Sequence, residues 1–133
     1  MRANPALIPP AVNEALRLGS PVRAFTRFAA KPYVAGDVAI PAGDRVLVLY
    51  ASANRDERRW TDPDAFDPTR DARDHVAFGH GVHRCAGGHL AQLELEALAR
   101  ALVRRVRRIE VGAPEVLLSN VLRGYRSFPA AFH

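Results

Sequence analysis

The chain has 133 residues, of which 48% are hydrophobic and 25% charged, and it carries a net charge of +5. These values suit one globular domain and argue against disorder. No apolar run approaches the roughly 20 residues that span a bilayer, the first residues lack the apolar stretch of a secretory signal, and a single cysteine excludes an internal disulfide. We therefore expect a cytoplasmic protein without membrane contact.

The first predicted element is a short helix over residues 10–18. Pro10 suits the first helical position, and Gly19 suits the C-terminal cap. Ser20-Pro21 follows, and the residue before a proline is disfavoured in helical conformation. The helix is therefore expected to end at this point.

Strand patterns follow the helix. Residues 22–29 alternate between two faces as a strand does. Residues 38–40 and 45–49 are predicted to form a hairpin, with Ile40-Pro41-Ala42-Gly43 as a type I turn, because proline is favoured second and glycine fourth in such a turn.

The remainder alternates between irregular and helical patterns. Residues 54–74 are rich in Asp, Arg and Pro, and we expect a long irregular segment that Trp60 and Phe66 attach to the body. A helix is predicted from Ala86 to about Val103, with an apolar face at helical spacing that comprises Leu90, Leu93, Ala97, Leu98, Ala101 and Leu102. Short strands and turns are expected after it. The predicted fold class is α+β with small sheets.

The most informative stretch is the cysteine loop, residues 77–87, which leads into this helix. Four glycines lie between positions 79 and 88, and glycine allows positive φ and a close approach of the backbone to a bound group. A thiolate is the ligating form of cysteine, and the free N–H groups of a helix N-terminus stabilise negative charge. The loop is therefore expected to hold the sulfur of Cys85 rigidly and exposed.

Four interpretations of Cys85 compete on the residues alone. A lone cysteine before a helix is most often a small buried apolar side chain. A nucleophilic cysteine needs a histidine base and an orienting group. Zinc is suggested by five residues, although the paired spacing of structural zinc sites is missing; they are His75, His80, His83, Cys85 and His89. A phosphate loop lacks both the third glycine of the dinucleotide pattern and a Walker lysine.

The pattern Phe78-x-x-Gly81-x-x-x-Cys85-x-Gly87 resembles the haem-binding loop of the cytochrome P450 superfamily. The resemblance implies that Cys85 is the thiolate ligand of the iron in haem b, iron protoporphyrin IX. It also implies that Gly79, Gly81 and Gly87 are among the haem-binding residues and that Phe78 shields the sulfur side of the haem.

Two further residues are assigned by the same likeness. His83 and Arg27 would contact the haem propionates. The other four histidines are expected at the surface; they are His75, His80, His89 and His133.

Two more motifs of the family occur in the matching order. Glu14-Ala15-Leu16-Arg17 resembles the Glu-x-x-Arg helix, and i, i+3 spacing puts both charged side chains on one helical face. Pro68-Thr69-Arg70 resembles the segment that supplies a second arginine. The resemblance implies a buried ion network of Glu14, Arg17 and Arg70 behind the cysteine loop.

The resemblance implies an α+β, partial cytochrome P450 fold. It would comprise the Glu-x-x-Arg helix, small sheets, the long irregular segment, the cysteine loop and the helix after it. Residues 1–133 would form a single C-terminal fragment, without the N-terminal part that carries the oxygen-binding helix. The implied function is haem and iron binding within a monooxygenase that inserts one oxygen atom of O2 into a small organic substrate. The isolated chain is expected not to be catalytic.

The expected partner is a ferredoxin-type electron donor on the proximal face. Arg84 and the arginines near residues 104–108 would attract such an acidic protein. Two alternatives stay open at this point: a non-catalytic gene remnant or haem-binding module, and a basic nucleic-acid-binding domain. No aromatic residues alternate with these arginines, so no nucleic-acid partner is expected.

Overall fold

A computed structural model describes all 133 residues. The helical elements are η1 (Pro5–Leu7), α1 (Ile8–Gly19), α2 (Tyr50–Ala53), η2 (Gly81–His83) and α3 (Gly88–Arg105). The strands are β1 (Phe25–Phe28), β2 (Tyr33–Ala35), β3 (Val38–Ile40), β4 (Arg45–Val48), β5 (Ile109–Val111), β6 (Glu115–Val116), β7 (Tyr125–Ser127) and β8 (Ala130–Phe132). This mixture of helices and two-stranded sheets confirms the predicted α+β class.

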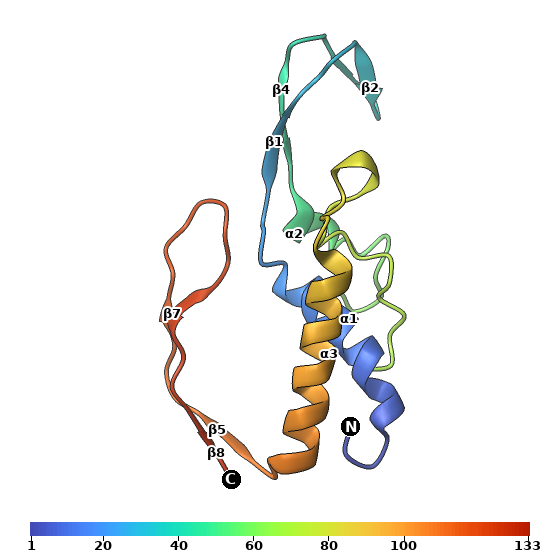
Figure 1. Ribbon diagram of the computed structural model, residues 1–133. Coiled ribbons are helices and arrows are strands. Elements are labelled where there is room, and N and C mark those ends of the chain that lie inside the picture. The colour runs from blue at the N-terminus through green and yellow to red at the C-terminus, as the bar shows by residue number, and fades with distance from the viewer.

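The crossing of α1 and α3 forms the centre of the molecule (Figure 1). Ile8, Val12 and Leu16 of α1 form its buried cluster, and Ala99 and Val103 of α3 pack against them. Burial of apolar area at this crossing stabilises the chain by roughly 25 cal/mol per Å².

The apolar face that the spacing predicts lies on α3, and much of it is exposed. Leu90, Leu93 and Leu98 are 61%, 66% and 57% exposed. Ala99 and Val103 are the residues of α3 that pack against the buried cluster of α1.

Helix α1 begins two residues before the predicted start. Ile8 is its first residue, so Pro9 and Pro10 lie in the first turn. Proline is tolerated there because the first N–H groups of a helix have no acceptor within the helix.

Ser20, rather than Gly19, is the residue that adopts the left-handed conformation after α1, with φ at 38°. The buried Ser20 hydroxyl donates to the Arg17 carbonyl at 2.7 Å and accepts from Asn54 Nδ2 at 2.9 Å. These two bonds explain a serine at a position where glycine is usual. The prediction of a Gly19 cap was therefore wrong.

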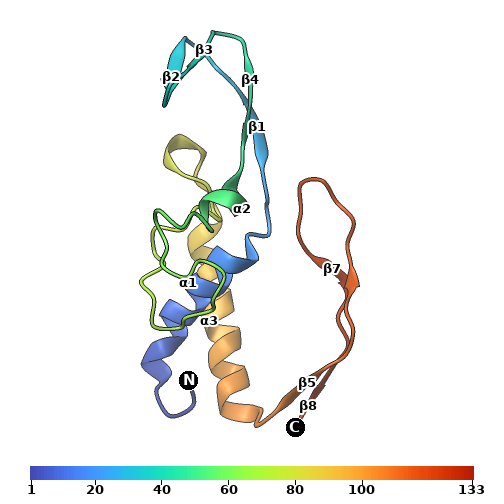
Figure 2. The same ribbon diagram turned by 180° about the vertical axis from the view of Figure 1, so that it is seen from behind.

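The predicted hairpin of residues 38–40 and 45–49 does not form. Strand β3 pairs with β2 and β4 pairs with β1, both antiparallel. Figure 2 shows the β2–β3 pair at the far end of the β1–β4 ribbon. The predicted strand 22–29 is reduced to β1 and joins this ribbon.

The turn before β4 differs from the predicted type I turn by one residue. The Asp44 N–H donates to the Pro41 carbonyl at 3.3 Å, and Gly43 has φ at 87°. Positive φ at the third position is characteristic of a type II turn, where glycine is preferred. Gly43 is therefore part of the turn as predicted, but the turn spans residues 41–44 and begins one residue later than predicted.

Residues 54–80 contain no helix or strand, which confirms the long irregular segment. Trp60 attaches it to the body: the side chain is 4% exposed, and its Nε1 donates to the Ala53 carbonyl at 3.1 Å. Phe66 is 50% exposed, so its predicted anchoring role is wrong. Helix α2 was not predicted, because the apolar run that precedes and enters it favours a strand.

None of the helices combines the length and the apolar character that crossing a membrane requires.

Candidate functional site

Cys85 lies in the loop between η2 and α3, and its thiol is free and exposed. The Cys85 N–H donates to the Phe78 carbonyl at 2.7 Å, and the Cys85 carbonyl accepts from the Gly88 N–H at 3.2 Å. Both backbone groups of the cysteine are therefore fixed while the sulfur is open. Figure 1 shows this loop in yellow at the end of α3 that lies next to α2.

Two loop glycines adopt positive φ, and one is required by close packing. Gly79 has φ at 72°, and a Cβ on it would lie 2.8 Å from the His83 carbonyl oxygen. Gly81 has φ at 59° with open space around it. Gly87 has φ at −88° and open space, so the loop conformation alone does not require glycine there.

Phe78 connects the cysteine loop to the helical core. Its ring carbons lie 3.4–3.6 Å from the position of a Cβ on Gly88, the first residue of α3. The ring also packs against the α1 cluster and lies 5.7 Å from the His75 ring. An alanine Cβ at Gly88 would thus be in ordinary van der Waals contact with the ring, and there is little further space on this side of Phe78.

The three residues of the expected ion network lie together. The side chains of Glu14 and Arg17 are both fully buried, and Arg17 donates from Nε to Oε2 at 2.7 Å and from Nη2 to Oε1 at 2.8 Å. Arg70 Nε and the Asp67 N–H both donate to Oε1 at 3.1 Å. Four donors thus satisfy one buried carboxylate, which is what allows it to be buried while charged.

Arg17 also anchors the irregular segment. Its Nη1 donates to the carbonyls of Asn54 and Pro63 at 2.6 Å and 2.7 Å, and its Nη2 donates to the Ala65 carbonyl at 3.3 Å. The guanidinium lies 5.2 Å from the Trp60 ring centroid. One side chain of α1 therefore holds several points of a segment that has no regular structure of its own.

Glu14 remains ionised in this environment. Burial on its own would raise the pKa of the carboxyl, but the hydrogen bonds from Arg17, Asp67 and Arg70 outweigh it and lower the pKa below its usual value. The network is therefore an ion pair at neutral pH.

His75 was expected at the surface, but it is half-buried beside the loop. Its Nδ1 accepts from the Ala77 N–H at 3.1 Å, which requires that nitrogen to be unprotonated. Burial, followed by the charge of Arg84, lowers the pKa of His75 below its ordinary 6.5. His75 is therefore neutral at neutral pH, and the surface assignment was wrong because the packing on Phe78 is not visible in the sequence pattern.

Acid should destabilise the folded chain through His75. The lowered pKa means that the unfolded chain binds the proton more readily, so stability should fall as the pH drops below about 6.5 towards the folded-state pKa. Urea unfolding at about pH 7 and about pH 5 measures the loss, and His75→Phe should make it smaller. His89→Phe, at an exposed position, is the control; an equal effect of both variants would contradict this assignment.

The other histidines of the loop do not form a metal site. His80, His83 and His89 are exposed, and no group of three or more His, Cys, Asp or Glu side chains is arranged to hold a metal ion. The geometry therefore gives the zinc alternative no support.

Arg27 is half-buried on β1, and its guanidinium is only partly used within the chain. Nη1 donates to the Thr26 carbonyl at 2.9 Å, and Nη2 donates to the Tyr50 hydroxyl at 3.4 Å. Donors of Arg27 thus remain for an anionic group. The side chain of His83, in η2, makes no hydrogen bond within the chain and is equally available.

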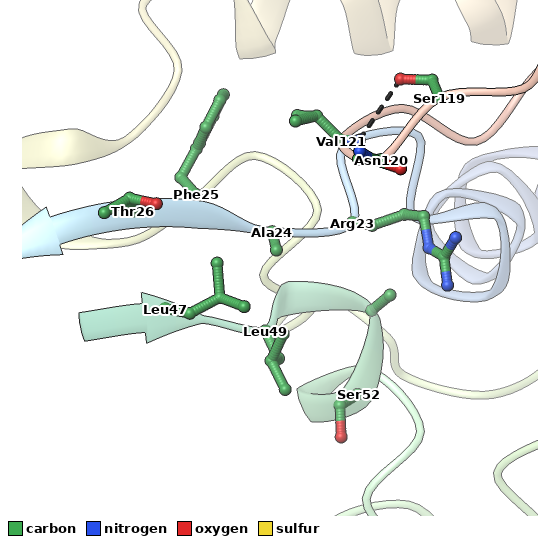
Figure 3. A pocket seen from close by; sticks show the side chains of 11 residues that line it. Arg23, Ala24, Phe25, Thr26, Leu47, Leu49, Ser52, Ser119, Asn120 and Val121 are labelled. Atoms are coloured by element: carbon green, nitrogen blue, oxygen red, sulfur yellow. Dashed lines mark hydrogen bonds between the residues drawn. The ribbon is translucent and has the colours of Figure 1, made fainter. Parts of the chain in front are cut away.

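A pocket of about 650 Å³ was not foreseen from the sequence (Figure 3). It is lined by Arg23, Ala24, Phe25, Thr26, Leu47, Leu49, Ala51, Ser52, Ser119, Asn120 and Val121. The Arg23 N–H donates to the Val121 carbonyl at 2.8 Å, which joins segments nearly a hundred residues apart. No local pattern could predict this contact. Figure 3 shows that the lining residues come from three separate parts of the chain: the β1 segment, the segment of β4 and α2, and the segment that carries Ser119, Asn120 and Val121.

The predicted group of basic residues is divided. Arg84 lies before the start of α3 and makes no side-chain hydrogen bond or ion pair, whereas Arg104 and Arg105 end that helix. An 18-residue helix is about 27 Å long. Arg84 and the arginines near residues 104–108 therefore do not form one patch.

The family model described as Cytochrome P450 matches residues 1–114. The chain is 44% identical to cytochrome P450 CYP199A2 of Rhodopseudomonas palustris over 130 residues. This alignment covers 97% of this chain and 32% of that protein. It is 39% identical to cytochrome P450-terp of a Pseudomonas species, over 98% of this chain and 31% of that protein. The chain thus spans about a third of the length of these relatives.

Solved structures agree with the sequence comparison. CYP108D1 from Novosphingobium aromaticivorans superposes with a TM-score of 0.92 at 39% identity, over 99% of this chain and 32% of that one. P450BioI, solved in complex with an acyl carrier protein ligated by hexadec-9Z-enoic acid, gives a TM-score of 0.93 at 36% identity, over 99% of this chain and 34% of that one. The chain belongs to the cytochrome P450 family.

Proposed function

We propose that this chain carries the haem-ligating part of a monooxygenase that inserts one oxygen atom of O2 into a small organic substrate. The observation that carries the proposal is the geometry of Cys85. Its sulfur is exposed and free, while its N–H and carbonyl are both hydrogen-bonded at the start of an 18-residue helix. A sulfur held in this way is available to bind a metal.

The donor set of the chain fits a haem. A single thiol, with no cluster of other metal ligands around it, suits an iron whose remaining ligands come from a macrocycle. The Cys-x-x-Cys-His pattern of covalently attached haem does not occur in these residues, which favours haem b. When bound, haem would supply the chemistry of O2, and cysteine ligation of its iron favours O–O cleavage.

The residues around Cys85 would take distinct parts in holding the haem. Phe78 would cover the sulfur side, since its ring packs on the first residue of α3. Arg27 and His83 would bind the propionates, because both carry unused hydrogen-bond donors. Glu14, Arg17 and Arg70 would have a structural role, holding the segment that leads to the loop.

The 650 Å³ pocket would form part of the wall around the substrate. Its lining combines apolar side chains such as Phe25 and Leu47 with a few polar ones, as is usual for sites that bind small organic molecules.

Titration of the haem-free chain with haem tests the proposed function. We expect saturable binding and the low-spin ferric electron paramagnetic resonance signal of thiolate ligation. Cys85→Ser should bind haem more weakly and lack that signal. Binding with the same signal in Cys85→Ser would contradict the proposal.

We propose a ferredoxin-type electron donor as the partner, and we place the chain with it in the cytoplasm. Arg84 is the exposed, unpaired cation nearest to Cys85 in sequence, so an acidic protein that docks there would bring its electron close to the iron. Charge reversal by Arg84→Glu should slow association with a ferredoxin about tenfold at low salt and reduce the salt dependence of the rate.

Arg105→Glu supplies the matched control. It makes the same change in net charge at the other end of α3, so it should change the association rate much less. Stopped-flow mixing with a bacterial ferredoxin measures both rates. Equal effects of the two variants would show that overall charge, rather than the surface beside Cys85, attracts the donor.

A further inference from the structure

We propose that Asn54 is a positioning residue for Cys85, because its buried side chain joins the end of α1 to the backbone that enters the cysteine loop.

Asn54 is 1% exposed, and it is hydrogen-bonded to two segments that are far from it in the chain, the end of α1 and the backbone that enters the cysteine loop. Its Nδ2 donates to the Ser20 hydroxyl at 2.9 Å, and its Oδ1 accepts from the Val76 N–H at 2.8 Å. Its backbone carbonyl accepts from Arg17 Nη1 at 2.6 Å. Because each bond uses a buried or partly buried group, removal of the side chain would leave polar groups without partners.

The Val76 N–H is where this arrangement reaches the cysteine loop. The Val76 carbonyl accepts from the Gly79 N–H at 2.9 Å, which closes a tight turn, and the Phe78 carbonyl within that turn accepts from the Cys85 N–H at 2.7 Å. The bond from Asn54 to Val76 therefore fixes the turn whose carbonyl in turn fixes the cysteine backbone.

The turn has little freedom to settle elsewhere. Gly79 is already in positive φ, and its Cα is so close to the His83 carbonyl that a Cβ would lie 2.8 Å from the oxygen. A small displacement of Val76 would therefore change the relation between Phe78 and Cys85. In this way the buried ion pair of α1 is connected to the cysteine through Asn54.

Asn13 provides a matched comparison. It is the other buried asparagine, 7% exposed, and both the nitrogen and the oxygen of its side-chain amide are hydrogen-bonded. Its Nδ2 donates to the Pro9 carbonyl at 3.2 Å, and its Oδ1 accepts from Gln92 at 3.3 Å. These bonds stay within α1 and α3, so Asn13→Ala removes a buried amide without removing any of the hydrogen bonds that lead to Cys85.

Amide hydrogen exchange of the haem-free chain tests the role of Asn54. In Asn54→Ala, exchange at Gly79 and Cys85 should speed up at least about tenfold relative to amides in the middle of α1. Asn13→Ala should leave this ratio as it is in the unmodified chain. Asn54→Asp, which keeps an acceptor for the Val76 N–H, should retain most of the protection.

Three results would overturn the assignment. One is unchanged relative exchange at Cys85 in Asn54→Ala, and another is an equal change in Asn13→Ala. The third applies even if Asn54→Ala does not fold: loss of protection at Cys85 in a folded Asn54→Asp variant, which still offers Val76 an acceptor.

The relevance of Asn54 to the iron rests on the proposed haem ligation by Cys85. Measurements on haem-loaded samples distinguish a failure of that proposal from a failure of the role assigned to Asn54. With reduced haem and carbon monoxide, Asn54→Ala should convert a larger share of the red-shifted Soret band to the shorter-wavelength band than Asn13→Ala does. If the unmodified chain shows no red-shifted band, the proposed function fails, while the exchange measurements still decide the role of Asn54.

Discussion

Replacement of Glu14 by glutamine should lower the free energy of unfolding by about 3–5 kcal/mol, because it leaves a buried charge without its partner. Arg17 is fully buried, and its Nε and Nη2 both donate to this carboxylate. Glutamine keeps the shape but offers only one oxygen and no negative charge. If this oxygen takes the place of Oε1, the amide nitrogen faces Arg17 Nε; if it takes the place of Oε2, Arg70 and the Asp67 N–H, which share Oε1, lose their acceptor.

Urea unfolding followed by circular dichroism measures this cost. The control is Glu94→Gln, at an exposed glutamate of α3 without an ion pair, which should change stability by no more than about 0.5 kcal/mol. A Glu14→Gln variant as stable as Glu94→Gln would show that the buried pair is not what holds the irregular segment to α1.

Replacement of Gly79 by alanine should cost about 2–5 kcal/mol, because it combines an unfavourable backbone conformation with a steric collision. The φ of 72° disfavours any residue with a Cβ, and that Cβ would lie 2.8 Å from a backbone oxygen that cannot move freely. The Phe78 carbonyl lies one residue away, so the hydrogen bond to Cys85 should be lost with the turn.

Gly36→Ala separates the two effects. Gly36 also has positive φ, at 59°, but open space surrounds it in the β2–β3 turn. It should cost only about 1 kcal/mol and leave the cysteine loop unchanged. Thermal unfolding gives the two costs, and the reactivity of the Cys85 thiol towards a disulfide reagent reports on the loop. Equal costs at the two glycines would contradict the close packing of Gly79.

Local spacing was sufficient for parts of the fold that depend on neighbours in sequence. The i, i+3 separation of Glu14 and Arg17 fixes both on one face of any helix, and the structure places them in contact. The irregular segment followed from its Asp, Arg and Pro content. The same composition could not show that Trp60, but not Phe66, would be buried, because burial depends on where the segment meets α2.

Contacts between distant segments account for the failures. The strand pairing was wrong because two short strands near each other in sequence were paired with each other, whereas β1 and β4 enclose both β2 and β3. No sequence pattern singled out Asn54, because an asparagine in a polar segment usually indicates a turn. Its importance lies in bonds to Ser20 and Val76 that only the folded chain brings together.

The resemblance to a known family supplied what spacing could not. Nothing in local physics links Arg70 to Glu14 across 56 positions, yet their side chains meet at 3.1 Å. The apolar face of α3 shows what a periodic pattern cannot predict. Its helical periodicity was read correctly, but the structure leaves much of that face exposed, because periodicity identifies a face without identifying what covers it.

Ligation of haem iron by the thiolate of Cys85 is tested most directly by the reduced carbon-monoxide difference spectrum of the haem-reconstituted chain, recorded beside Cys85→Ala. We expect a strongly red-shifted Soret band in the unmodified chain and its loss in the variant. Only a shorter-wavelength band, the same in both proteins, would contradict thiolate ligation by this loop.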